Sequence, residues 1–268
     1  MDIQKAKEEI KNTLAAYLQK DADGNYRYPL VNQRPLLLMG PPGVGKTAIV
    51  EQAAREAGLP MVSYTMTHHT RQSAVGLPKI TERDYCGQHF SVTEYTMSEI
   101  IGAVYAAMDR SGKGEGILFL DEINCVSETL APTMLQFLQN KTFGTHALPL
   151  GWIIVAAGNP PEYNKSVREF DVVTLDRIRW ISVEASVEAF LGYGAAAGLH
   201  GAVLSFLGLK PEKFYHVSRQ EDQLRYVTAR GWEDLSRLLQ SCEELGLPVG
   251  EELVREFLNL EETARDFT

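Results

Sequence analysis

The stretch Gly40-Pro-Pro-Gly-Val-Gly-Lys-Thr47 follows the apolar run Leu36–Met39 and precedes a helix-like run that begins at Ala48. It fits the phosphate-loop pattern G-x-x-x-x-G-K-[ST]. Glycines let the backbone curl so that successive N–H groups point at phosphate oxygens, and the helix that follows presents its positive end to the same anion. A strand before the loop and a helix after it are the context that this motif requires. The stretch therefore predicts a nucleotide site.

The two side chains that end the motif have separate expected roles. Lys46 can reach the β- and γ-phosphates, and the Thr47 hydroxyl can ligate Mg²⁺. The backbone of the loop is expected to surround the phosphates. The predicted nucleotide-binding residues are Gly40, Pro41, Pro42, Gly43, Val44, Gly45, Lys46, Thr47 and Ala48.

The composition is ordinary for a soluble globular protein, with 44% hydrophobic and 23% charged residues in a chain of 268. This length allows one large domain or two smaller ones. The formal net charge of −9 argues against a broad basic surface for nucleic acid or membranes. No apolar run approaches the roughly 20 residues that span a bilayer, and the first residues lack a signal-peptide core, so we expect a cytoplasmic location. The three cysteines lack the spacing of a zinc site or a disulfide framework.

Hydrophobic periodicity predicts an α/β domain in the first part of the chain. Residues 36–39 read as a strand, the run from Thr47 to Gly58 as a helix, and residues 61–65 as a second strand. A strand, a helix and a strand in quick succession form a βαβ unit, which implies a parallel sheet. Further strands are expected at 117–120, 152–157 and 180–183, helices at 3–18, 97–108 and 127–138, and hairpins within 76–96 and 140–150.

The run Ile117-Leu-Phe-Leu-Asp121-Glu122 places two carboxylates at the end of a buried strand. Ligands of open parallel sheets bind at the carboxyl ends of the strands, so we expect this pair, on an adjoining strand, beside the phosphate loop. Asp121 is the expected partner of Thr47 in binding Mg²⁺, and Glu122 is expected to orient and deprotonate the water that attacks the γ-phosphate. Asn159 ends another predicted strand, where it could hydrogen-bond the γ-phosphate or the attacking water.

From Ser186 onward, helical patterns replace the strand-like runs. Helices are expected at 187–199, 202–207, 232–245 and 251–264. We therefore place a domain boundary near residue 185. The predicted domains are an α/β nucleotide-binding domain at 1–185 and a small helical lid domain at 186–268.

Taken together, these elements resemble those of an AAA+ ATPase, and within that superfamily the MoxR-like group. The matching elements are residues 40–47 (Walker A), residues 117–122 (Walker B), Asn159 in Ala-Ala-Gly-Asn-Pro (sensor 1), Leu175-Asp-Arg177-Ile and Thr228-Ala-Arg230-Gly. The resemblance covers almost the whole chain. It implies a P-loop NTPase fold, a parallel sheet flanked by helices with a C-terminal helical lid, and it implies ATP and Mg²⁺ as cofactors.

The resemblance also implies a homo-oligomeric ring, a hexamer, with nucleotide at each subunit boundary. There, an arginine from the neighbouring subunit approaches the γ-phosphate. Arg177 matches that position best, and Arg168 and Arg179 are rivals because the connection over 163–173 departs from the shorter usual form. Arg230 matches sensor 2, an arginine carried by the lid. The predicted catalytic residues are Glu122, Lys46, Asn159, Arg177 and Arg230.

The function that the resemblance implies is Mg²⁺-dependent ATP hydrolysis coupled to chaperone-like remodelling or maturation of a protein client, in this group often one with a von Willebrand A-type domain. A nucleic-acid-directed motor, such as a helicase or restriction-type translocase, is an alternative that the acidic net charge disfavours. A second alternative is a nucleotide-gated scaffold that binds ATP without hydrolysing it. The intact acidic pair, Asp121 and Glu122, argues against this alternative. A small-molecule kinase is the least favoured alternative, because a kinase needs an acceptor pocket and the lid here carries a sensor-type arginine instead. The regions 76–96 and 141–151 fall where MoxR-like proteins have hairpins that project toward partners.

Overall fold

The computed structural model describes residues 1–163, 167, 170–220 and 223–268. The chain divides into two compact units. The sheet unit consists of Lys7–Met39 and Thr47–Ser182, and the C-terminal unit consists of Met1–Ala6, Gly40–Lys46 and Val183–Thr268. The phosphate loop thus groups with the C-terminal unit, whereas the strand before it and the residues after Lys46 belong to the sheet unit.

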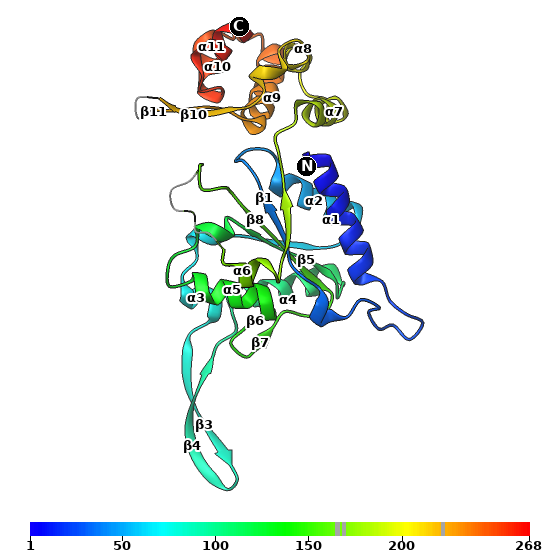
Figure 1. Ribbon diagram of the computed structural model, residues 1–268, viewed down its shortest axis with the longest axis vertical. Helices are drawn as coiled ribbons and strands as arrows, with labels where there is room; N and C mark the ends of the chain where they lie inside the picture. The colour runs from blue at the N-terminus through cyan, green and yellow to red at the C-terminus, as the bar shows by residue number, and fades with distance from the viewer. Residues whose placement is uncertain (164–166, 168–169, 221–222) are drawn as a thin grey trace. The chain divides into compact units, whose positions relative to one another are not determined.

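The sheet unit is built on five parallel strands (Figure 1). Both β1 and β8 are buried along their whole length, as expected of parallel strands covered on both faces. The parallel sheet is therefore confirmed. Its order is β2-β5-β8-β1-β9, so β8 separates β5 from β1, and the expectation that the acidic pair lies on the strand adjoining β1 is wrong. The strands are β1 (Leu36–Met39), β2 (Met61–Thr65), β5 (Gly116–Asp121), β8 (Trp152–Gly158) and β9 (Arg179–Ser182).

Amphipathic helices pack against this sheet. Ser98 caps the start of α4 by accepting a hydrogen bond from the N–H of Ile100, and Gly112 ends the helix in the left-handed conformation. Helix α5 begins at Ala131, later than its pattern predicts, because residues 127–130 form a turn. The helices of this part of the chain are α1 (Ile3–Leu18), α2 (Lys46–Glu56), α3 (Arg71–Val75), α4 (Glu99–Ser111), α5 (Ala131–Asn140) and α6 (Val172–Leu175).

Two antiparallel hairpins leave the sheet unit, as the sequence predicts. In the longer one, β3 (Pro78–Tyr85) pairs with β4 (Gln88–Tyr95) over the full length of both strands. It extends away from the rest of the unit (Figure 1), and most of its side chains are exposed. The shorter hairpin joins β6 (Thr142–Phe143) to β7 (His146–Ala147).

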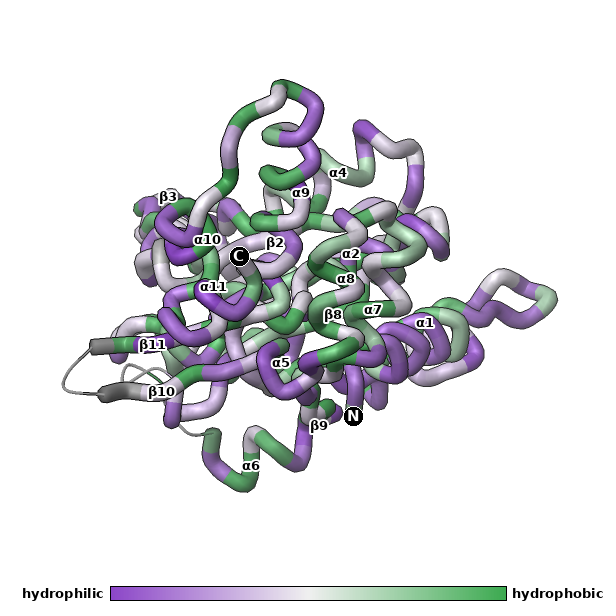
Figure 2. The backbone as a smooth tube through the Cα atoms, turned by 90° about the horizontal axis from the view of Figure 1, so that it is seen from above, coloured by the Kyte–Doolittle hydropathy of each residue, from purple (hydrophilic) through white to green (hydrophobic). Residues whose placement is uncertain are grey.

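The C-terminal unit contains three of the predicted helices, a fourth that is divided in two, and a hairpin that the sequence analysis did not predict. Its core forms around Trp232, whose ring lies 5.5 Å from that of Phe206 and 5.4 Å from that of Phe267. Helix α8 is hydrophobic along most of its length (Figure 2). The unpredicted hairpin pairs β10 (His216–Gln220) with β11 (Gln223–Val227). The helices are α7 (Val187–Ala197), α8 (Gly201–Leu209), α9 (Ala229–Leu245), α10 (Glu251–Phe257) and α11 (Glu261–Phe267).

The single helix expected over 251–264 is two helices, α10 and α11. The break lets Leu258 turn into the core, where it is fully buried, and it frees the carbonyl of Asn259 to accept a hydrogen bond from the N–H of Tyr226 at 3.2 Å. Long-range packing therefore overrides the helical pattern at this point. Among the residues that the structure describes, no helix has both the length and the apolar character needed to cross a membrane.

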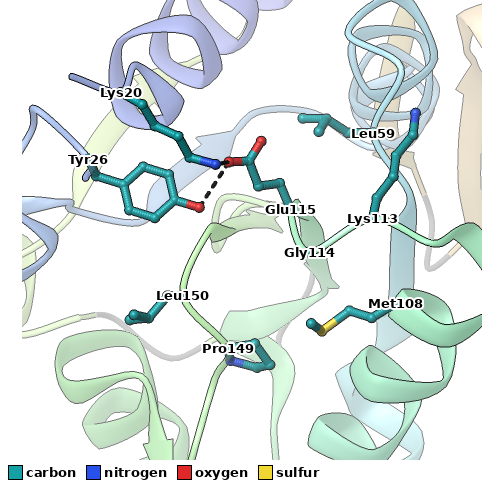
Figure 3. A pocket seen from close by; sticks show the side chains of 9 residues that line it. All are labelled: Lys20, Tyr26, Leu59, Met108, Lys113, Gly114, Glu115, Pro149 and Leu150. Carbon is teal, nitrogen blue, oxygen red and sulfur yellow. Dashed lines mark hydrogen bonds and ion pairs between the residues drawn. The ribbon is translucent and has the colours of Figure 1, made fainter. Parts of the chain in front are cut away.

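A cavity of about 460 Å³ lies where β2, β5 and β8 begin, at the end of the sheet opposite their carboxyl ends (Figure 3). On one wall, the Glu115 carboxylate accepts a hydrogen bond from the Tyr26 hydroxyl at 2.9 Å and pairs with the Lys20 ammonium at 2.7 Å. Burial and this neighbouring carboxylate raise the pKa of Tyr26 to about 12. The network anchors the loop after α1 to the sheet and takes no part in the site at the other end.

Candidate active site

The glycines of the phosphate loop are required by its backbone. Gly43 and Gly45 have φ values of +72° and +96°, in the region that favours glycine. At Gly40, a Cβ would lie 2.3 Å from the carbonyl oxygen of Val183. Helix α2 begins at Lys46, so the first N–H groups of that helix lack partners within the helix and can face an anion. Positive φ values and a helix that begins directly after the glycines are features that a phosphate-binding loop needs.

The Lys46 side chain is held close to the loop that carries it. It is 7% exposed, and its ammonium donates hydrogen bonds to the carbonyls of Gly40 and Pro41, each at 2.8 Å. Both acceptors are neutral. A phosphate oxygen carries charge and would therefore form a stronger bond with this ammonium than either carbonyl does.

Thr47 and Asp121, the two predicted metal ligands, are in direct contact. The Thr47 hydroxyl, in the first turn of α2, donates a hydrogen bond to Asp121 Oδ2 at 3.1 Å, at the end of β5. The other carboxylate oxygen, Oδ1, accepts from the N–H of Glu122 at 2.9 Å. Among the described residues, no group of three or more His, Cys, Asp or Glu side chains could hold a metal ion. A hydroxyl and one carboxylate fit Mg²⁺, which keeps several waters and shares phosphate oxygens rather than filling a protein cage.

Glu122 is oriented by a residue that the sequence analysis did not select. The backbone of Glu122 is left-handed, with φ +54°, and its carboxylate accepts a hydrogen bond from the Thr67 hydroxyl at 2.9 Å. Thr67 follows β2, which pairs with β5 so that Thr65 lies opposite Asp121. The available signal was a polar residue just past the carboxyl end of a parallel strand, but the pairing of β2 with β5 could not be read from the sequence.

We expect Thr67→Val to lower kcat for ATP hydrolysis about tenfold and to leave KM nearly unchanged. Valine keeps the shape of threonine but cannot donate the hydrogen bond that orients the carboxylate of Glu122. Steady-state phosphate release measures both constants. Thr65→Val is the control, because it makes the same substitution at an exposed position, the last residue of β2. A higher kcat in Thr67→Val would show that the hydrogen bond restrains Glu122 instead of positioning it.

Asn159 follows β8, the strand between β1 and β5. The strand order thus places the residue between the strand that leads into the phosphate loop and the strand that carries the acidic pair. Its main-chain carbonyl accepts a hydrogen bond from the side-chain amide of Asn124 at 2.8 Å. Its role toward the γ-phosphate stays a prediction.

The three arginines considered for action on a neighbouring subunit differ in their surroundings. Arg177 is exposed and donates a hydrogen bond to the side chain of Gln139. Arg179 forms an ion pair with Glu9 of α1 and donates to the hydroxyl of Thr13 at 2.7 Å. Because these contacts hold the guanidinium of Arg179 within its own subunit, Arg177 is the better candidate. Arg168 lies outside the described residues.

Arg230 lies in the C-terminal unit, together with the phosphate loop. It is exposed, and its backbone N–H donates to the carbonyl of Gly43 at 3.1 Å. Near it, Thr228 caps α9, and a Cβ on Gly43 would lie 2.8 Å from the Thr228 Cβ. The Tyr215 hydroxyl donates to the carbonyl of Pro42 at 2.9 Å, a contact that the sequence analysis did not foresee. The predicted sensor arginine therefore lies in the first turn of α9, and this turn contacts the phosphate loop directly.

Comparison with known families matches residues 36–175 to the model of the ATPase family associated with various cellular activities (AAA). The match covers more than half of the chain and contains the phosphate loop, the acidic pair and Asn159, whereas Arg177 and Arg230 lie beyond it. No curated protein matches the chain. The parallel sheet and the phosphate loop are both those expected of this family. The chain therefore belongs to the ATPase family associated with various cellular activities (AAA).

Proposed function

We propose that this chain is a Mg²⁺-dependent ATPase of MoxR-like type, which hydrolyses ATP at the subunit boundaries of a hexameric ring and uses the cycle to remodel or mature a partner protein. Membership of the AAA family supports ATP hydrolysis in general, and members of this family commonly form rings. The observation that carries the proposal is the 3.1 Å hydrogen bond between Thr47 and Asp121, with Glu122 as the next residue. It joins the end of the phosphate-loop motif to the acidic pair.

The side chains divide the reaction into separate tasks. Lys46 and the loop backbone bind the phosphates, while Thr47 and Asp121 hold the metal. Bound Mg²⁺ would neutralise charge on the β- and γ-phosphates. Glu122 accepts a proton from the attacking water, and Asn159 hydrogen-bonds that water or the γ-phosphate. Arg177 of one subunit and Arg230 of the lid supply positive charge where negative charge develops.

Phosphate release with and without free Mg²⁺ tests this function. We expect turnover to need Mg²⁺ and to stop when EDTA chelates the metal. Without Mg²⁺, the negative charge of the phosphates would lie beside the carboxylate of Asp121 and would not be neutralised. With calcium in place of magnesium we expect little turnover, because Mg²⁺ prefers near-ideal octahedral coordination and the larger Ca²⁺ does not. An absence of turnover in Mg²⁺ would contradict the proposal, and strong stimulation by DNA or RNA would favour a nucleic-acid-directed motor.

We propose that the partner protein meets the long hairpin β3–β4. Ile80, Tyr85, Phe90 and Tyr95 are 75%, 54%, 45% and 42% exposed on an arm whose other side chains are mostly polar or charged. Tyr85 and Phe90 share one face of the hairpin, with ring centroids 6.2 Å apart, and exposed apolar side chains on a projecting element are typical of protein-binding surfaces. The resemblance to MoxR-like proteins points to a client with a von Willebrand A-type domain.

A further inference from the structure

Asn124 is a buried polar residue two positions after Glu122. It lies in the short 3₁₀ helix Ile123–Cys125 and is 2% exposed. Its side-chain amide nitrogen donates a hydrogen bond to the main-chain carbonyl of Asn159 at 2.8 Å. A hydrogen bond made by a buried side chain is costly to lose, because the groups that remain have already been removed from water. The bond therefore links the segment after β5 to the segment after β8.

The backbone on both sides is shaped for this contact. The left-handed conformation of Glu122 turns the chain directly after β5, and the N–H of Cys125 closes the turn on the carbonyl of Glu122 at 2.9 Å. On the other side, a Cβ on Gly158 would lie 2.5 Å from the Asn124 Oδ1. Any larger residue at position 158 would push the amide away. The amide of Asn124 is thus fitted between the two strand ends.

We propose that Asn124 is a positioning residue, which sets the direction of the Asn159 side chain relative to Glu122. The hydrogen bond fixes the peptide plane after the Cα of Asn159, and the pairing of Gly158 with Met39 holds the residue before it, so together they set the direction in which the side chain leaves the backbone. Asn124 and Glu122 share one tight turn, so the same turn orients both predicted catalytic groups. Asn124 acts only through Asn159 and does not itself touch the nucleotide. This inference rests on the proposed ATPase function.

The primary test replaces the donor without changing the size of the side chain much. We expect Asn124→Leu to lower kcat for ATP hydrolysis about 10- to 100-fold, because small displacements of a positioned group have effects of this size. KM and the affinity for ADP should stay within about twofold, since the phosphate loop is unchanged. Asn124→Ala, which removes the donor without burying a charge, is the second variant if Asn124→Leu folds poorly.

Gln33 offers a matched control at the other end of the sheet unit. It is 5% exposed, it precedes β1, and its side-chain amide donates to the carbonyl of Tyr17 at 3.0 Å. Gln33→Met therefore removes another hydrogen bond from a buried side-chain amide to a main-chain carbonyl, far from the carboxyl ends of the strands, together with the longer contact of its Oε1 to the Lys141 ammonium at 3.4 Å. We expect both variants to unfold at lower temperature than the wild type, and only Asn124→Leu to lose kcat. Equal losses of kcat would overturn the proposal, because a general structural effect would then explain them.

A double-mutant cycle separates action through Asn159 from action through Glu122. In Asn159→Ala the main-chain carbonyl remains, but the side chain to be positioned is absent. We therefore expect Asn124→Leu to cause no further loss of kcat in that background. A full multiplicative loss would overturn the proposal, as would a wild-type kcat in Asn124→Leu alone. A wild-type chain without any turnover would overturn the ATPase function together with this inference, so the two failures are distinguishable.

Discussion

Glu122→Gln is expected to bind ATP as well as the wild type and to hydrolyse it about 10²–10⁴-fold more slowly, the usual size of a general-base contribution. Glutamine has the shape of glutamate, and its side-chain oxygen can still accept the hydrogen bond from Thr67, which is 2.9 Å long in the structure. It cannot accept the proton of the attacking water. The change therefore removes one chemical step and leaves the phosphate loop, Thr47 and Asp121 as they are.

Two measurements are needed for this variant. Equilibrium binding of a fluorescent ATP analogue gives the affinity, and single-turnover phosphate release gives the rate of the chemical step. Glu51→Gln is the matched control, because it makes the same substitution at an exposed position of α2. If Glu122→Gln hydrolysed ATP at the wild-type rate, Glu122 would not be the base. If neither protein hydrolysed ATP although both bound it, a nucleotide-gated scaffold would explain the chain better.

Arg177→Ala is expected to lower kcat by about 10³–10⁵. This is the range found for arginines that stabilise the charge of the transition state in related phosphoryl-transfer enzymes. The side chain is exposed and its hydrogen bond goes to the neutral side chain of Gln139, so it can be redirected to a phosphate at modest cost. Nucleotide affinity should change little, because the phosphate loop and the metal ligands are untouched. Arg110→Ala, at an exposed position in the last turn of α4, is the control.

Mixing two inactive variants tests whether Arg177 acts between subunits. In a mixed ring, an Arg177→Ala subunit keeps its own Glu122 and receives Arg177 from a Glu122→Gln neighbour. We therefore expect the mixture to recover activity that neither variant has alone. An arginine that acts within its own subunit would give no recovery. Light scattering with and without ATP should show the assembly, and a monomer under every condition would contradict the proposed mechanism.

The sequence by itself determined the phosphate loop and the elements next to it. The conformation of this loop depends on residues that are neighbours in the chain: glycines at 43 and 45 take positive φ, an apolar strand precedes them and α2 follows. Runs of apolar residues likewise located the central strands β1, β5 and β8, because burial on both faces leaves a local signature in each of them. The match to the AAA family covers the phosphate loop and four of the five strands, all except β9.

The tertiary structure alone decided which of these elements meet. The sequence does not encode locally that β8 separates β1 from β5, that Thr67 reaches Glu122, or that Arg179 is held by Glu9. It also did not reveal the hairpin β10–β11 or the bond from Asn124 to Asn159. The physical reason is that periodicity and turn chemistry report the environment of each segment, whereas strand order and side-chain partners depend on how distant segments pair and pack.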